Sequence, residues 1–162
     1  MGIGIFAAAW RRAAAMTAQS PALRILLVED HADTAEVFAR LLETRGFRVS
    51  VAGTFASALD QARRLPFDLL LCDIQLPDGN GLELLPKLRN ELGMDDLRAV
   101  AFSGYGGKAI VQRAKEAGFD AYMLKPVEMG KLFGLLEQVC RAQHPLRSPR
   151  AGFIAILAPT VG

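Results

Sequence analysis

The run Asp68-Leu-Leu-Leu-Cys-Asp73 decides the fold of this chain, because it places a carboxylate directly after four apolar residues. Short apolar runs bounded by turn residues predict buried strands of a parallel sheet. Three further apolar runs have the same plan, and they end at Glu29-Asp30, at Ser103-Gly104 and at Lys125-Pro126. Ligands of open α/β sheets bind at the carboxyl ends of the strands. The sequence therefore predicts that three carboxylates, one hydroxyl and one ammonium group meet at one edge of a sheet.

Strands and helices alternate along the middle of the chain. Expected strands cover residues 24–28, 47–51, 68–72, 98–102 and 120–124. Expected helices cover residues 32–45, the segment between Thr54 and Pro66, a segment through Leu82, Leu85 and Leu88, and residues 105–117 and 128–142. Pro86 leaves two interpretations of the third helix, a kink or a later start. This alternation predicts right-handed βαβ units and a parallel sheet with helices on both faces.

The composition fits one domain of ordinary size plus tails. The chain has 162 residues, of which 51% are hydrophobic, enough for a sizeable core. Its net charge of +2 is uneven, because three arginines precede residue 25 and three follow residue 140 with no acid among them. Residues 25–140 are therefore left with a net charge of −4. A mildly acidic middle argues against direct binding of nucleic acid.

The cysteines and the two ends carry weaker signals. Cys72 and Cys140 have no metal-type spacing, which favours a reduced, cytoplasmic compartment. We expect residues 1–23 to be a flexible extension with no secretory signal or membrane span, and Met16 is an alternative start. Residues 143–162 are expected to be a loose tail without an output domain. Its apolar segment 153–157 has three interpretations: a docking peptide, an added edge strand or a translation artefact.

Residues 24–142, roughly three quarters of the chain, resemble the receiver domain of two-component response regulators. The resemblance rests on Glu29-Asp30, on Asp73 before Leu76-Pro-Asp-Gly-Asn-Gly81, on Ser103-Gly104 and on Lys125-Pro126. It implies the α/β fold of the chemotaxis-regulator-like superfamily. That fold is a doubly wound (βα)5 flavodoxin-like sandwich, with a five-stranded parallel sheet in the order 2-1-3-4-5.

The acidic edge of the sheet calls for a cation, since neighbouring carboxylates repel one another. An all-oxygen site of this kind suits Mg²⁺. The resemblance implies that Asp30 and Asp73 bind the ion directly. It also implies that Glu29 acts partly through water and that the main-chain carbonyl of Gln75 contributes.

The resemblance further implies that Asp73 accepts a phosphoryl group from a histidine kinase or a histidine phosphotransfer protein. Lys125 would pair with Asp73 and then with a phosphoryl oxygen, and Ser103 would bind another oxygen. Ser103 and Tyr122 would then act as a switch. The switch would shift the face formed by the fourth helix, the fifth strand and the fifth helix. That face is also a candidate surface for a downstream protein target or a homodimer.

Plainer roles compete for several residues. His31 is expected to be an exposed residue that opens the first helix rather than a metal ligand, and Cys72 is expected to pack in the core. Tyr122 has the alternative of ordinary half-buried packing. Asp33 and Asp78 are expected to be solvated or to cap helices. The resemblance implies a cis peptide between Lys125 and Pro126, whereas an ordinary turn is the alternative.

We expect a single-domain response regulator, because the 20 residues after the last helix are too few for a DNA-binding module. Three forms remain open: a stand-alone regulator, a phosphorelay intermediate, and a receiver separated from a hybrid histidine kinase. No enzymatic turnover is expected beyond slow self-dephosphorylation. A metal-dependent phosphohydrolase is the rival, but Gln75 occupies the position where such enzymes usually have a second Asp. A binding module that never accepts phosphate is the last alternative.

Overall fold

The computed structural model describes residues 22–141 and 152–157. Its main sheet is parallel and six-stranded, with the order β2-β1-β3-β6-β7-β8. The strands are β1 (Arg24–Val28), β2 (Arg48–Ala52), β3 (Leu69–Asp73), β6 (Arg98–Ser103), β7 (Ala121–Leu124) and β8 (Ile154–Ile156). A small antiparallel hairpin pairs β4 (Gln75–Leu76) with β5 (Gly79–Asn80).

The order of the first five strands of the main sheet confirms the predicted 2-1-3-4-5 topology. The predicted number of strands was wrong, because β8 adds a sixth strand beside β7. Of the three interpretations of residues 153–157, the added edge strand is the one that the structure shows. Residues 1–21, 142–151 and 158–162 lie outside the described part of the chain, so the expected extension and loose tail stay predictions there.

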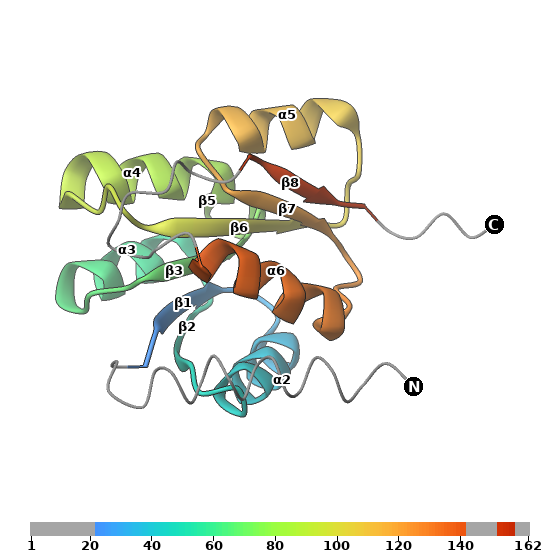
Figure 1. The fold of residues 1–162 in the computed structure, drawn as a ribbon. Helices are drawn as coiled ribbons and strands as arrows, with labels where there is room; N and C mark the ends of the chain where they lie inside the picture. The colour runs from blue at the N-terminus through green and yellow to red at the C-terminus, as the bar shows by residue number, and fades with distance from the viewer. Residues whose placement is uncertain (1–21, 142–151, 158–162) are drawn as a thin grey trace.

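Helices cover both faces of the sheet. They are α2 (Ala32–Glu43), α3 (Phe55–Arg64), α4 (Leu84–Leu92), α5 (Lys108–Glu116) and α6 (Met129–Arg141), with a short 3₁₀ turn η1 (Gly81–Glu83) before α4. Figure 1 shows α2 and α6 on one side of the sheet and α3, α4 and α5 on the other. One apolar cluster lies under each group of helices. Because the central strand β3 is buried at every residue, these two clusters fix its position between them.

Local signals account for the helix ends. Thr54 caps α3 as predicted: its hydroxyl accepts from the N–H of Ser57, and the Ser57 hydroxyl accepts from the N–H of Thr54. The Asp78 carboxylate accepts from the N–H groups of Phe55 and Ala56, which confirms its expected capping role. Pro86 lies in the first turn of α4, where proline is tolerated, so the later start is the correct interpretation. The helix expected from residue 105 begins only at Lys108.

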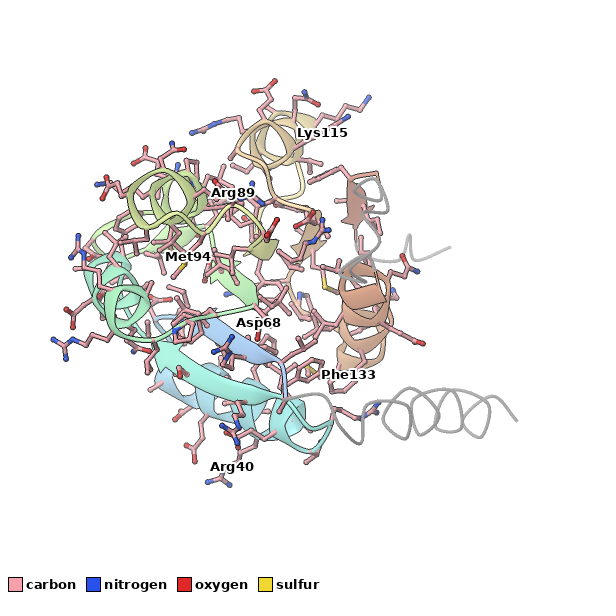
Figure 2. All side chains as sticks on the ribbon, turned by 60° about the vertical axis from the view of Figure 1, so that its left-hand side comes forward. Arg40, Asp68, Arg89, Met94, Lys115 and Phe133 are labelled. Atoms are coloured by element: carbon pink, nitrogen blue, oxygen red, sulfur yellow. The ribbon has the colours of Figure 1, made fainter. Side chains whose placement is uncertain are left out.

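Two side chains tie helices to the rest of the fold. Arg89 on α4, labelled in Figure 2, donates to the carbonyl oxygens of Gly118 (3.1 Å) and Leu97 (2.8 Å). Phe133 on α6 stacks under the guanidinium of Arg45, whose carbon lies 4.1 Å from the ring centre. The first contact joins α4 to the loops before β6 and β7, and the second joins α6 to the loop between α2 and β2. No helix in the described residues is both long and apolar enough to cross a membrane.

Candidate functional site

The fold brings the predicted polar residues to the carboxyl edge of the sheet. Glu29 follows β1, Asp73 ends β3, Ser103 ends β6 and Lys125 follows β7. Main-chain hydrogen bonds fix two of these positions, from the N–H of Glu29 to Ala52 (3.0 Å) and from the N–H of Lys125 to Ser103 (2.8 Å). In the part of the chain that the structure describes, the buried polar or charged residues are Glu29, Asp73 and Ser103. Buried polar groups are costly unless partnered, so their concentration at one edge indicates a site.

Lys125 joins two of the buried acids. Its ammonium nitrogen lies 2.6 Å from Asp73 Oδ2 and 2.8 Å from Glu29 Oε2. Burial alone would lower the pKa of Lys125, but the two carboxylates outweigh it and the net shift is upward. Burial alone would raise the pKa of Glu29, but hydrogen bonds from Lys125 and His31 lower it. Both groups are therefore held in their charged forms. The Lys125–Pro126 peptide is cis, as the resemblance implied.

Glu29, Asp30 and His31 form a second group, in which each residue offers an atom that could bind a metal ion. The Nδ1 atom of His31 lies 3.2 Å from both Glu29 Oε1 and Asp30 Oδ1, and ligand atoms of all three residues lie within 4.8 Å of one another. The hydrogen bond with Glu29 raises the pKa of His31. His31 is exposed at the start of α2, as expected, but its contact with both acids was missed. The only sequence signal for that contact is its position directly after them.

The carboxylate oxygens of this group are suitable ligands for a divalent cation. Oxygen ligands from Glu29 and Asp30 meet at a partly exposed position, since the Asp30 side chain is 31% exposed. Carboxylate oxygens beside solvent suit hard ions that retain some of their waters. Asp73 is not in this group of three and is joined to Glu29 through Lys125. Whether Asp73 and the carbonyl of Gln75 also bind the ion stays a prediction.

The loop after Asp73 is held close to the carboxylate. Asp73 Oδ1 accepts from the N–H of Gln75 (2.9 Å), and the N–H of Gly81 donates to Ile74 (2.7 Å). A Cβ atom on Gly81 would lie 2.1 Å from the main-chain oxygen of Asp73 and 2.9 Å from the sulfur of Cys72. Position 81 therefore needs glycine for this close approach. Cys72 itself is fully buried and packs in the core as expected.

Ser103 and Tyr122 meet at a shared neighbour. The Ser103 hydroxyl accepts from the N–H of Tyr105 at 3.0 Å, and the Tyr122 hydroxyl donates to the carbonyl oxygen of Tyr105. Tyr122 is fully buried, not half-buried, and its ring points inward. Burial raises the pKa of Tyr122, while a hydrogen bond with Ser103 acts in the opposite direction. Tyr105, which no sequence signal singled out, thus connects the two predicted switch residues.

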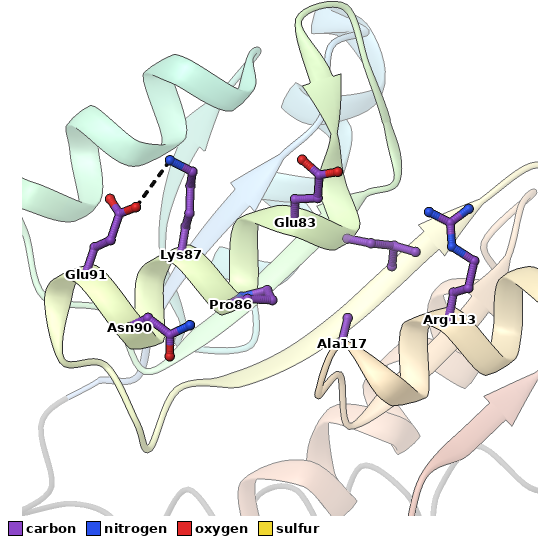
Figure 3. Close-up of a pocket in the computed structure, with 8 residues that line it drawn as sticks. Glu83, Pro86, Lys87, Asn90, Glu91, Arg113 and Ala117 are labelled. Carbon is purple, nitrogen blue, oxygen red and sulfur yellow. Dashed lines mark hydrogen bonds and ion pairs between the residues drawn. The ribbon is translucent and has the colours of Figure 1, made fainter.

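The structure has a hollow beside this edge and another away from it. A cleft of about 630 Å³ is lined by Ser103, Tyr105, Gln75 and neighbouring residues of the loop after Asp73. A second hollow of about 380 Å³ lies between α4 and α5 (Figure 3). Its lining includes Pro86 and Arg113 but none of the predicted site residues. The first cleft therefore lies on the side of the sheet edge formed by Ser103 and the loop after Asp73.

The sequence comparison decides the family. Residues 25–137 match the model of the response regulator receiver domain. This chain is a member of that family. A receiver domain is a phosphoacceptor module of two-component signalling rather than an enzyme with turnover, and it implies a histidine kinase as partner. The rival phosphohydrolase is thereby disfavoured.

Curated relatives of the receiver differ in length. The chain is 34% identical over 121 residues to an uncharacterized 14.6 kDa protein of Leptolyngbya boryana, covering 75% of this chain and 92% of that protein. It is 34% identical to the phosphate regulon transcriptional regulatory protein PhoB of Klebsiella pneumoniae, covering 77% of this chain but 55% of that protein.

One solved relative carries the modification and a metal. A response regulator protein from Burkholderia pseudomallei, solved with a phosphorylated aspartic acid, a calcium ion and citrate, is 28% identical. Its TM-score is 0.65, with 78% of this chain and 75% of that chain covered. Receiver domains thus bind a divalent metal at the site of phosphorylation.

Proposed function

We propose that this receiver accepts a phosphoryl group on Asp73 from a phosphohistidine of a histidine kinase or a histidine phosphotransfer protein. The observation that carries the proposal is the Lys125 ammonium, which lies within 2.8 Å of both Asp73 and Glu29 at the carboxyl edge of the sheet. A carboxylate that already pairs with a fixed cation is well placed to receive an anionic group. The cleft beside Ser103 leaves the approach open.

Each residue of the site has a part in the transfer. An oxygen of Asp73 attacks the phosphorus atom, the P–N bond to the donor imidazole breaks, and an acyl phosphate forms. Lys125 stays within reach of the transferred oxygens as a point charge, and the Ser103 hydroxyl donates to another oxygen. Bound Mg²⁺ supplies charge neutralisation between the carboxylates and the incoming group. Glu29, Asp30, Asp73 and the main-chain carbonyl of Gln75 would hold that ion.

The output is proposed to be a protein contact. The hydrogen bonds around Tyr105 link Ser103 to Tyr122, so a shift of Ser103 toward the phosphoryl group changes the surroundings of β7. The face formed by α5, β7 and α6 would then bind a downstream target or a second copy of the chain. We infer a stand-alone regulator, since the Leptolyngbya boryana relative is covered over 92% of its length. A cytoplasmic location is proposed separately, on the two cysteines that lack metal-type spacing. A phosphorelay intermediate and a receiver separated from a hybrid kinase remain alternatives.

The test is phosphorylation of an Asp73→Asn variant. The wild-type protein, incubated with Mg²⁺ and acetyl phosphate, is expected to gain one phosphoryl group in the intact mass spectrum. Asp73→Asn should form that adduct at least about 100-fold more slowly, a barrier rise of about 2.7 kcal/mol or more, while its circular dichroism is unchanged. Asp33→Asn, an exposed acid of α2, is the matched control and should be phosphorylated normally. A retained adduct in Asp73→Asn would contradict the assignment of the acceptor.

A further inference from the structure

The strand β8 covers the edge of β7 that would otherwise end the sheet. Its residues pair in parallel with β7, in the register Ala121–Ile154, Tyr122–Ala155 and Met123–Ile156. The N–H of Ile154 also donates to the carbonyl of Asp120 at 3.1 Å. Figure 1 shows β8 beside β7, with α5 on one side and α6 on the other. An uncovered strand edge is a template for pairing with another chain, so β8 occupies a potential interaction surface.

Apolar side chains anchor β8 on both faces of the sheet. Phe153 packs against the cluster that contains Tyr122 and Ala114 of α5. Ile154 and Ile156 pack against the cluster on the α6 side. Ala155 and Leu157 remain exposed. Main-chain pairing combined with alternating side-chain contacts is the way in which a sheet edge recognises an extended peptide.

The position of β8 couples this edge to the predicted switch. Ala155 pairs with Tyr122, whose ring is fully buried and whose hydroxyl donates to Tyr105. Paired residues of adjacent strands lie about 5 Å apart, so β8 restrains the main chain at this tyrosine. Any movement of β7 that accompanies a rearrangement of Ser103 and Tyr122 must therefore break or shift the pairing with β8.

We propose that the β7 edge between α5 and α6 is a peptide-docking edge, and that residues 153–157 are its resident ligand. A second copy of the chain gains this edge only after β8 leaves it. The segment thus acts as a built-in competitor for the face. The inference rests on the proposed function in one respect, that this face is the output face.

The test compares two full-length variants by hydrogen exchange and mass spectrometry. Ile154→Asp/Ile156→Asp places charges in the apolar contacts of β8, whereas Leu157→Asp changes a side chain that is already 47% exposed. The double variant should exchange its β7 amides at least tenfold faster than wild type, and Leu157→Asp should match wild type. A synthetic peptide, Gly-Phe-Ile-Ala-Ile-Leu-Ala (residues 152–158), should bind the double variant and restore its protection, with little binding to wild type.

Equal exchange of β7 in all three proteins, or equal binding of the peptide to wild type and double variant, would overturn the inference. Intact-mass measurement of the phosphoryl adduct in the same samples separates it from the proposed function. If wild type forms the phosphoryl adduct but the double variant shows unchanged β7 exchange, the docking edge is wrong and Asp73 remains the acceptor. If wild type forms no adduct but β7 exchanges faster in the double variant, the proposed acceptor is wrong and the docking edge remains. Light scattering with fluoroberyllate then shows whether the uncovered edge pairs two copies, since the double variant should dimerise more than wild type.

Discussion

The two ends of the sheet both carry charged residues, but the charges balance at the amino end and do not balance at the carboxyl end. At the amino end, Arg24 pairs with Asp68 at 3.2 Å, and Arg98 pairs with Asp120 at 3.3 Å. Both aspartates also accept main-chain N–H groups, at 2.8 Å for Asp68 and 2.9 Å for Asp120. Each acid there has its own cation, and each pair joins neighbouring strands. This end is electrostatically satisfied and serves the fold.

At the carboxyl end the same pairing is incomplete. Lys125 is shared between two buried acids, Glu29 and Asp73, and Asp30 adds a third carboxylate nearby. The excess of negative charge costs stability unless a cation joins the group. A balanced pair thus identifies structural charge, whereas an unbalanced buried group identifies charge that is retained for chemistry.

The largest expected effect comes from removing the shared cation. Lys125→Met leaves Glu29 and Asp73 without their ammonium, which should lower the free energy of unfolding by about 3 kcal/mol, the lower end for a broken buried pair. Mg²⁺ should recover part of that loss, because it supplies positive charge at the same edge. Urea denaturation with Mg²⁺ or with EDTA measures both effects.

The matched control lies at the other end of the sheet. Arg98→Met also breaks a largely buried pair, since the side chains of Arg98 and Asp120 are 12% and 9% exposed. It should destabilise the protein to a similar degree, but equally with Mg²⁺ and with EDTA. If Mg²⁺ rescued Arg98→Met as well as Lys125→Met, the contrast between the two ends of the sheet would be wrong.

A somewhat smaller effect is expected from crowding the loop at the carboxyl end. Gly81→Ala would place a methyl group against the main-chain oxygen of Asp73, so the loop must move. Overpacking of this kind costs about 1–3 kcal/mol, and the displaced loop should slow phosphorylation of Asp73. Gly79→Ala is the control in the same loop, because its methyl group would make only an ordinary 3.5 Å contact with Phe55. Urea midpoints and the rate of adduct formation measure the difference, and equal behaviour of the two variants would refute it.

The sequence predicted most of this carboxyl end because parallel strands bring their ends to one edge. Glu29, Asp73, Ser103 and Lys125 each follow an apolar run, so the placement depends only on the topology. The contacts of His31 and Tyr105 escaped prediction, since they depend on ring and main-chain orientations in loops. The sixth strand remained one of three interpretations, because residues 153–157 follow a Pro- and Arg-rich stretch whose path no periodicity specifies. Local patterns therefore predicted the elements, while the contacts between loops required the structure.

A smaller effect is expected from the metal itself. Mg²⁺ at ten times its dissociation constant should stabilise the wild-type protein by about 1.4 kcal/mol, because it binds the folded state alone. Asp30→Asn removes a partly exposed carboxylate ligand from the predicted metal site and should weaken this stabilisation. Thermal unfolding at increasing Mg²⁺ concentration measures it, with Asp68→Asn at the amino end as the control that keeps the response. An undiminished response in Asp30→Asn would exclude Asp30 from the metal site.

The smallest expected effect is the pH dependence that Glu29 contributes. Lys125 and His31 hold the pKa of Glu29 below its ordinary value of 4.5, against the effect of burial. A lowered folded-state pKa stabilises the protein above the unfolded value, and this contribution is lost as the pH falls through the folded value. Unfolding in EDTA between pH 7 and about pH 3 should therefore show a steeper acid loss in wild type than in Glu29→Gln. Glu36→Gln, on the exposed face of α2, is the control and should keep the wild-type slope. If Glu29→Gln also kept the wild-type acid slope, Lys125 would not be holding Glu29 in its charged form. The proposed electrostatic contrast between the two ends of the sheet would then lose this part of its support.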